Sequence, residues 1–115
     1  MKRATLLFVS AVLVSGPALA QGSTPFPADD KTLAAGLEIA EIHCASCHAI
    51  STDDASAEEG APPFRTLSQL YPLESLEESL AEGIVTGHEG MPEFAFAPED
   101  IDAFLGYLSS IQIQK

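Results

Sequence analysis

A chain of 115 residues with 17 acidic and five basic side chains carries a formal net charge of −12. This charge excludes nucleic acid as a natural partner, because phosphate binding requires clusters of Lys and Arg, and it disfavours adsorption to anionic lipid. The length is that of one domain rather than several.

The first 20 residues have the pattern of an export signal. Lys2 and Arg3 form a positive start, an apolar run follows over residues 6–14, and small residues end at Ala20. A membrane anchor is the competing interpretation, but Pro17 interrupts the apolar run well before the roughly 20 residues that span a bilayer. The pattern therefore predicts cleavage after Ala20, no membrane anchor and a soluble periplasmic protein.

The predicted mature chain, residues 21–115, is a single domain that keeps three basic residues against 17 acidic ones, a net charge of −14. Such a charge favours a redox partner with a basic docking face, although an acidic surface that only maintains solubility fits the composition equally well. A chain this small buries only about 60–65% of the surface that its unfolded form exposes. A bound prosthetic group would therefore help to supply its core.

Asp29 and Asp30 are positioned to cap a helix that runs to about residue 44, with a carboxylate at its positive end. Apolar and small side chains recur along one face of this helix: Leu33, Gly36, Leu37, Ala40 and Cys44. A glycine in mid-helix costs about 1 kcal/mol relative to alanine. Gly36 therefore predicts that another element crosses the helix at close range.

The end of this helix carries Cys44-Ala45-Ser46-Cys47-His48, the spacing that covalent attachment of a c-type haem requires. On a helical turn the two cysteines and the histidine project from one face, so each thiol can add to one haem vinyl group and the histidine can bind the iron. A disulfide is the main alternative in an oxidising compartment, whereas a thioredoxin-like site would need a β-α-β pattern and a zinc site four ligands. The motif predicts one haem c, attached through Cys44 and Cys47, with its iron bound by His48.

The remaining segments predict short helices joined by long loops. Residues 50–63 are acidic and small, residues 66–70 favour a helical turn, and Pro72 is placed to start a helix. The glutamates of that helix indicate a solvated face rather than a metal site, because no histidine accompanies them. Residues 83–97 show no helical or strand periodicity of apolar residues, and Pro98 begins an apolar last helix. The fold class is therefore all-α, with three or four short helices whose long loops wrap around a bound group.

Met91 is the one methionine that remains after removal of the signal, and it is the candidate for the sixth ligand position of the iron. A thioether is a soft donor, and His/Met ligation raises the reduction potential of a haem. Nearby glycines and Pro92 suit a loop that passes close to a flat ring, while a core methionine that fills a gap is the alternative. His88 competes as the ligand, since it lies three residues earlier, and His43 is expected to point away from the iron.

With these residues in place, the chain resembles the small class I cytochromes c of bacterial periplasms, and the resemblance covers nearly all of residues 21–115. It implies the cytochrome c fold, in which a glycine of the first helix faces an aromatic residue of the last, matched here by Gly36 and Tyr107. It also implies a proline after the haem motif whose carbonyl accepts a hydrogen bond from the axial histidine. Pro62 matches this position best, and Pro63 is the alternative.

The chain departs from this family in two respects. Several members dock through a ring of lysines, whereas the mature chain holds only Lys31, Arg65 and Lys115 as cations. This implies docking of the opposite charge sign, or apolar contact at the haem edge. Some members use a tryptophan to hydrogen-bond a haem propionate, and this chain has none. Arg65 and Tyr71 are the candidate substitutes, and Arg65 is favoured because it is the only cation between Lys31 and Lys115.

The combined prediction is a monomeric, periplasmic monohaem cytochrome c that carries single electrons between redox proteins and is not an enzyme. His48 and Met91 would hold six-coordinate iron with no open site for a substrate. Two alternatives stay open. One is a dedicated cytochrome subunit of a periplasmic dehydrogenase or oxidase, and the other is a haem protein that binds or senses a ligand through a labile Met91.

Overall fold

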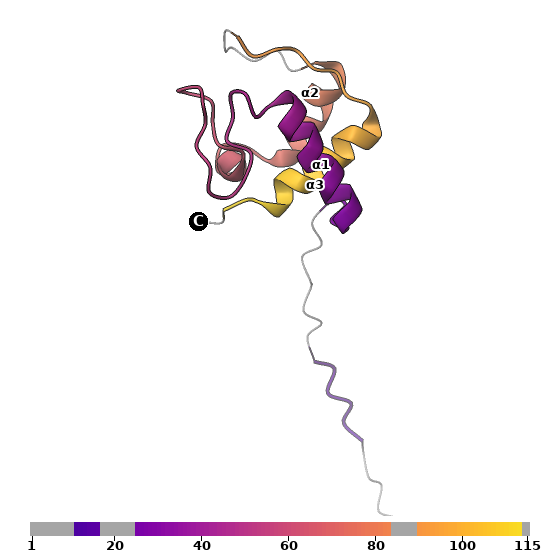
Figure 1. Ribbon diagram of the computed structural model, residues 1–115. Coiled ribbons are helices and arrows are strands. Elements are labelled where there is room, and N and C mark those ends of the chain that lie inside the picture. Colours follow the sequence, from indigo (N-terminus) through magenta and orange to yellow (C-terminus); the bar gives the residue numbers. More distant parts are fainter. Residues whose placement is uncertain (1–10, 17–24, 84–89, 114–115) are drawn as a thin grey trace, which may run out of the picture.

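The computed structural model describes residues 11–16, 25–83 and 90–113, and the regular structure in these segments is entirely helical (Figure 1). Three α-helices and two 3₁₀ helices follow one another along the chain: α1 (Asp30–His43), η1 (Phe64–Gln69), η2 (Leu73–Ser75), α2 (Leu76–Glu82) and α3 (Pro98–Ser110). The predicted all-α class is confirmed. Within the described segments, no helix is long and apolar enough to cross a membrane.

Helix α1 begins where its first residues predict. Asp29 is the N-cap, and its carboxylate accepts hydrogen bonds from the amide of Thr32 at 3.0 Å and from the hydroxyl of Thr32 at 2.6 Å. These bonds favour the charged form and lower the pKa of Asp29. The cap fixes the start of α1, and the helix then runs to His43 so that Cys44 follows directly after its last residue.

Helices α1 and α3 cross at close range (Figure 1). A Cβ atom built on Gly36 would overlap the carbonyl of Ala103 and lie 2.6 Å from the Cβ atom of Tyr107. The predicted close crossing at Gly36, opposite Tyr107, is therefore confirmed. The Tyr107 hydroxyl also donates a hydrogen bond of 2.7 Å to the Ile50 carbonyl, which ties α3 to the loop after the cysteine motif.

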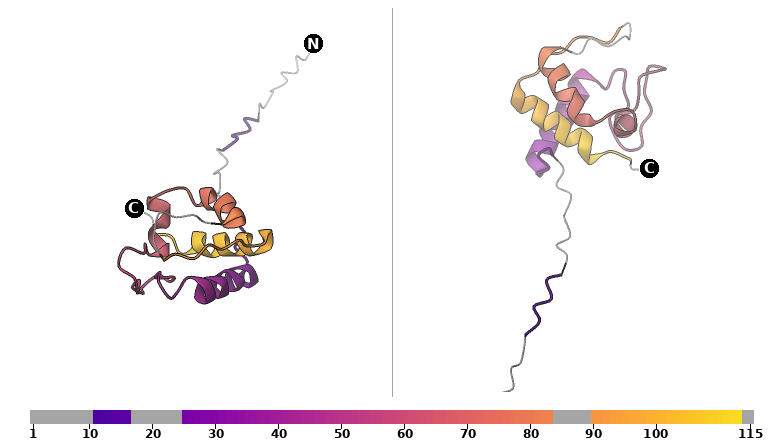
Figure 2. Two further views of the ribbon diagram at one scale, coloured as in Figure 1. Left: turned by 90° about the horizontal axis from the view of Figure 1, so that it is seen from above. Right: turned by 180° about the vertical axis from the view of Figure 1, so that it is seen from behind.

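Helix α3 lies between α1 and α2 (Figure 2, left) and contributes more residues to the core than any other helix. Its buried side chains pack against residues from the preceding segments in one hydrophobic cluster: Phe26, Ala40, Ile50, Phe64, Leu67, Leu73, Leu80, Ile101, Phe104, Leu105, Tyr107 and Leu108. The position of α3 matters for the site, because Phe104 and Leu108 belong both to this core and to the wall of the cavity described below.

The helix predicted from Pro72 begins differently from the prediction. Pro72 has an extended backbone, with ψ at 133°, and precedes the helix instead of forming its first residue. The amide and the hydroxyl of Ser75 both donate to the Pro72 carbonyl, at 3.1 and 2.7 Å. This closes the 3₁₀ turn η2, and α2 starts only at Leu76. The serine hydroxyl favours the tighter turn because it competes for the carbonyl that a regular α-helical turn would use.

The predicted helical turn near residues 66–70 is η1, and the C-terminal residues hold it in place. The side-chain amide of Gln112 donates to the carbonyls of Phe64 and Leu108 at 2.8 and 2.7 Å, and its oxygen accepts from the Ser68 amide at 2.9 Å. One glutamine therefore links the end of α3 to both ends of the short helix. Phe64 is thereby fixed beside the cysteine motif.

Candidate functional site

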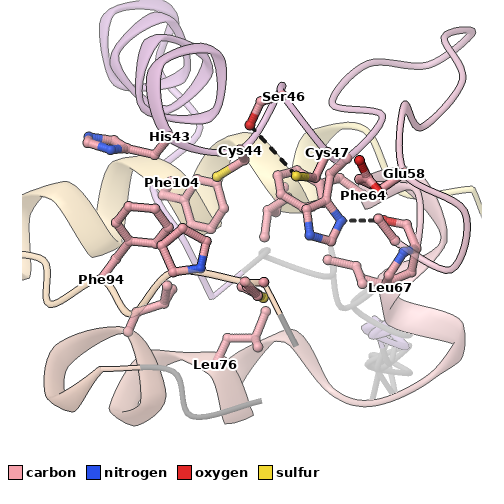
Figure 3. Close-up of a pocket in the computed structure, with 18 of the residues that line it drawn as sticks. His43, Cys44, Ser46, Cys47, Glu58, Phe64, Leu67, Leu76, Phe94 and Phe104 are labelled. Atoms are coloured by element: carbon pink, nitrogen blue, oxygen red, sulfur yellow. Dashed lines mark hydrogen bonds between the residues drawn. The ribbon is translucent and has the colours of Figure 1, made fainter. Parts of the chain in front are cut away.

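The cysteine motif continues α1 by one further turn. The Cys44 amide donates to the Ala40 carbonyl at 2.9 Å, and the His48 amide donates to the Cys44 carbonyl at 2.9 Å. Cys44 and Cys47 form no disulfide and are half-buried, and the Sγ atom of Cys47 lies 3.8 Å from the Ser46 hydroxyl. In Figure 3 the two sulfur atoms lie on one side of a hollow, with Leu76 on the opposite side. The turn therefore presents both thiols to the same space.

This hollow is a cavity of about 650 Å³, a volume typical of cofactor sites. It brings together five of the six predicted site residues: Cys44, Cys47, His48, Pro62 and Met91. The rest of its wall is mostly apolar and includes Phe64, Leu67, Leu76, Leu80, Phe94, Phe96, Phe104 and Leu108. Such a wall suits a large, flat and largely apolar group, and it keeps water away from the group that it encloses.

His48 is oriented by the loop that follows it. Its Nδ1 atom lies 2.9 Å from the Pro62 carbonyl oxygen. Because a carbonyl only accepts, Nδ1 carries the proton and Nε2 keeps the lone pair that can bind a metal. The Phe64 ring packs against the imidazole with centroids 4.9 Å apart. The Pro63 carbonyl instead accepts hydrogen bonds from η1. Of the two prolines, Pro62 therefore makes the predicted contact with His48.

The structure does not bring Arg65, the sixth predicted site residue, to the cavity. Its guanidinium donates to the Ser51 carbonyl at 3.3 Å, the Asp54 carbonyl at 2.9 Å and the Asp54 carboxylate at 3.3 Å. Asp54 in turn accepts from the amides of Ile50 and Ser51 at 2.8 and 3.0 Å. Burial raises the pKa of Asp54, but the hydrogen bonds from these amides outweigh it and the pKa is lowered. Arg65 therefore stabilises the loop after the cysteine motif.

Tyr71, the second candidate for binding a haem propionate, does line the cavity. Its side chain is 38% exposed, and burial of the remainder raises the pKa of its hydroxyl. The hydroxyl is therefore a neutral donor near neutral pH, at the boundary between an apolar wall and solvent. Such a donor suits a carboxylate, which makes Tyr71 the better candidate of the two on position.

Residues 90–97, here called the Met91 segment, have no regular secondary structure. Gly90 has a φ of +93°, which side chains of L residues rarely adopt. Nothing lies within 4 Å of a Cβ atom built there, so the glycine is needed for the direction of the backbone rather than for space. At the other end, the Phe96 amide donates to the Leu80 carbonyl of α2 at 2.9 Å. Met91 is half-buried in the cavity wall.

His43 lies at the rim of the cavity with its imidazole turned away from the two thiols (Figure 3). It packs edge-on against Phe94 and Phe96, with ring centroids 5.2 and 5.3 Å apart, and it is exposed to solvent. The sequence did not predict this cluster, because two phenylalanines in an irregular loop match neither a helical nor a strand period. His88, the predicted competitor of Met91, lies outside the described residues.

Comparison with known proteins decides the family. A family model described as Cytochrome c matches residues 33–112, more than half of the chain. The chain belongs to the cytochrome c family. No curated protein and no solved structure matches it. The chemistry of this cytochrome is haem-based electron transfer, and its haem is attached covalently through Cys44 and Cys47.

The cavity of this cytochrome fits a haem. Two thiols come from one turn, an imidazole carries a free lone pair on Nε2, and the rest of the wall is aromatic and aliphatic. Burial, and secondarily the neighbouring Cys47, raises the pKa of the Cys44 thiol to about 11. Before attachment this thiol therefore stays protonated near neutral pH. An uncharged thiol is compatible with an apolar wall, whereas a buried thiolate would not be.

The charged side chains of the cytochrome's cavity wall include two acids beside the attachment turn. Glu58 and Glu59 line the cavity and are exposed to solvent. The Glu58 amide donates to the Cys47 carbonyl at 3.2 Å, which holds this acidic pair next to the attachment site. In the described part of the chain, no lysine or arginine lines the cavity. The acidic pair therefore places negative charge beside the attachment turn.

Proposed function

We propose that this cytochrome c is a periplasmic carrier of single electrons, with His48 and Met91 as the two axial ligands of its iron and residues 1–20 removed on export. The observation that carries the proposal is that His48 and Met91 line the same cavity as Cys44 and Cys47. With both axial positions filled by the protein, no position remains for a substrate. The protein is therefore a carrier rather than an enzyme.

The side chains of the chain tune and shield the redox centre. Bound haem supplies a one-electron ferric/ferrous couple. The Pro62 carbonyl holds His48 in one tautomer and orientation, and this strengthens the donation of the imidazole to a metal. The Met91 thioether is a soft ligand that favours the reduced state. The apolar wall includes Phe64 and Phe104, whose ring centroids lie 5.7 Å apart. This wall limits the access of water and therefore lowers the reorganisation energy of each electron transfer.

The ligand assignment is tested by spectroelectrochemical titration of the holoprotein. We expect one Nernstian one-electron step in the wild type. Met91→Ala should lose the methionine-to-iron charge-transfer band of the ferric spectrum. It should also lower the potential by about 0.1 V or more, within the roughly 0.8 V range that axial ligands span. Glu93→Gln, an exposed position in the same segment, is the matched control and should keep the band.

Two results would contradict the proposal. If Met91→Ala leaves both spectrum and potential unchanged, Met91 is not a ligand and His88 becomes the candidate. If the reduced wild-type protein binds carbon monoxide rapidly at neutral pH, the sixth position is labile, and the protein binds or senses a ligand instead of only carrying electrons.

The partner of this carrier is proposed to be a redox protein with a basic docking face. The support is the charge of the chain, −12 overall, together with the position of Glu58 and Glu59 at the cavity. Opposite charges on two docking faces speed the encounter and orient the partners, with little effect on the electron-transfer step itself. Monomeric diffusion between such partners is the simplest arrangement for a domain of this size.

A further inference from the structure

The Met91 segment carries a proposed metal ligand on irregular backbone. It has no helix or strand hydrogen bonds of its own. Near its C-terminal end, the Phe96 amide donates to the Leu80 carbonyl of α2, and the Ala97 carbonyl accepts from the amides of Asp100 and Ile101 in α3. Aromatic rings add further contacts: Phe94 stacks on Phe96 with ring centroids 5.6 Å apart, and Phe96 stacks on Phe104 of α3 with centroids 6.4 Å apart.

His43 adds a contact from a third direction. It is the last residue of α1, directly before the haem-attaching Cys44. Its ring meets Phe94 at 5.2 Å with an interplanar angle of 62°, and meets Phe96 at 5.3 Å with an angle of 71°. Both are edge-to-face arrangements, the geometry that aromatic pairs prefer over stacking face to face. The His43 ring at the end of α1 therefore packs against both phenylalanines of the Met91 segment.

We propose that His43 is a positioning residue for Met91. Its imidazole, held edge-on against Phe94 and Phe96, ties the Met91 segment to the end of α1 and so keeps the Met91 thioether on the iron. The inference rests on the proposed His48/Met91 ligation. It gives His43 a role in the site although its ring is turned away from the thiols (Figure 3).

The exposure of His43 explains why a histidine suits this position. The residue is exposed to solvent while one side of its ring covers Phe94 and Phe96. A histidine can keep polar nitrogens near water while its ring packs on apolar neighbours, as amphipathic side chains do at a boundary. The ring, rather than the charge, makes the contact. Phenylalanine should therefore replace His43 better than alanine does.

The test measures how easily an added ligand displaces Met91. Ferric holoprotein is titrated with imidazole, and binding is followed in the visible spectrum for the wild type, His43→Ala, His43→Phe and Met91→Ala. Imidazole can bind only when the thioether has left the iron, so its affinity reports the occupancy of the methionine bond. We expect His43→Ala to bind imidazole roughly three- to tenfold more tightly than the wild type, the effect expected from losing an aromatic edge contact. His43→Phe should stay near the wild type.

Ile42→Ala is the matched control, because Ile42 is the preceding residue of α1 and is 67% exposed. It should leave imidazole affinity unchanged. If His43→Ala does not form holoprotein, His43→Gln replaces it, since glutamine also removes the ring but keeps a polar side chain. Thermal unfolding of each variant separates a general loss of stability from a loosened ligand.

The possible failures are distinguishable. If Met91→Ala binds imidazole more tightly than the wild type but His43→Ala does not, the role of His43 is overturned and the ligand assignment stands. The same holds if His43→Phe behaves like His43→Ala, because the ring is then not responsible. If Met91→Ala binds imidazole no more tightly than the wild type, the proposed ligation itself fails, and the inference about His43 falls with it.

Discussion

Asp54 organises the loop between the haem motif and Pro62. Its carboxylate accepts hydrogen bonds from two backbone amides and from Arg65. Its lowered pKa means that this stabilisation is complete above the ordinary aspartate value of 3.8 and is lost as the pH falls through the folded-state pKa. Asp54→Asn should therefore reduce the free energy of unfolding at pH 7 by about 1–2 kcal/mol, with allowance for solvent screening.

The same substitution should flatten the acid limb of the stability curve, measured by urea unfolding between pH 7 and pH 2. Asp53→Asn is the control, because Asp53 is the exposed neighbour and should change neither quantity beyond a few tenths of a kcal/mol. Equal stability curves for Asp54→Asn and the wild type would show that the loop does not depend on this carboxylate.

Single residues differ in how well the sequence predicts them, and the reason is the range of their contacts. Cys44, Cys47 and His48 lie on one turn, so their common direction follows from helix geometry alone. The role of Arg65 depends on which carboxylate lies next to it after the loop has folded. The residues near Arg65 in the sequence do not indicate this carboxylate. Counting cations favoured Arg65 for the cavity, whereas the structure pairs it with Asp54.

At the level of elements, the crossing of α1 and α3 depends on the absence of one side chain. Alanine at Gly36 would gain about 1 kcal/mol of helix propensity. Its methyl group would, however, meet backbone atoms of Ala103, which cannot move without shifting α3. We expect Gly36→Ala to lower the free energy of unfolding by about 1–3 kcal/mol, the usual cost of overpacking, measured by denaturant unfolding of the holoprotein.

Ala35→Gly, at the exposed neighbouring position, measures helix propensity without a change in packing and should cost about 1 kcal/mol. If Gly36→Ala instead stabilises the protein by the propensity gain, the helices can separate at this point and the close approach is not required.

The elements that were predicted well are those whose signal is local and periodic. The N-cap at Asp29, the first-turn proline Pro98 and the apolar stripes of both helices predicted α1 and α3. The start of α2 was misplaced, because a serine hydroxyl that competes for the Pro72 carbonyl leaves no trace in a hydrophobic period. Gly106 of α3 also makes a close approach, to Pro27, that the pattern did not indicate.

For the whole molecule, the cavity is the feature that no single segment predicts. Its wall combines the end of α1, η1, α2, α3 and the Met91 segment, and only packing brings these parts together. From the sequence, several parts of the cavity wall could be predicted: the cysteine motif, one methionine and the apolar faces of the helices. Which loop residues lie beside the attachment turn, including Glu58 and Glu59, had to come from the structure.

The acidic residues at the cavity should control the reaction of the carrier with charged partners. The oxidation of reduced holoprotein can be followed by stopped flow with a cationic ruthenium ammine complex and with anionic ferricyanide. Two unit charges about 10 Å apart interact by about 0.4 kcal/mol in water, so each glutamate removed should slow the cationic oxidant roughly twofold at low salt. The reaction with the anionic oxidant should become faster to a similar extent, and both differences should vanish at high ionic strength.

The control compares Glu58→Gln/Glu59→Gln with Glu38→Gln/Glu41→Gln, which removes two exposed charges from α1. If the site at the cavity matters, the change in rate for Glu58→Gln/Glu59→Gln should exceed the change for Glu38→Gln/Glu41→Gln. Equal changes would mean that only the net charge of the molecule acts, and no docking face at the cavity would be needed.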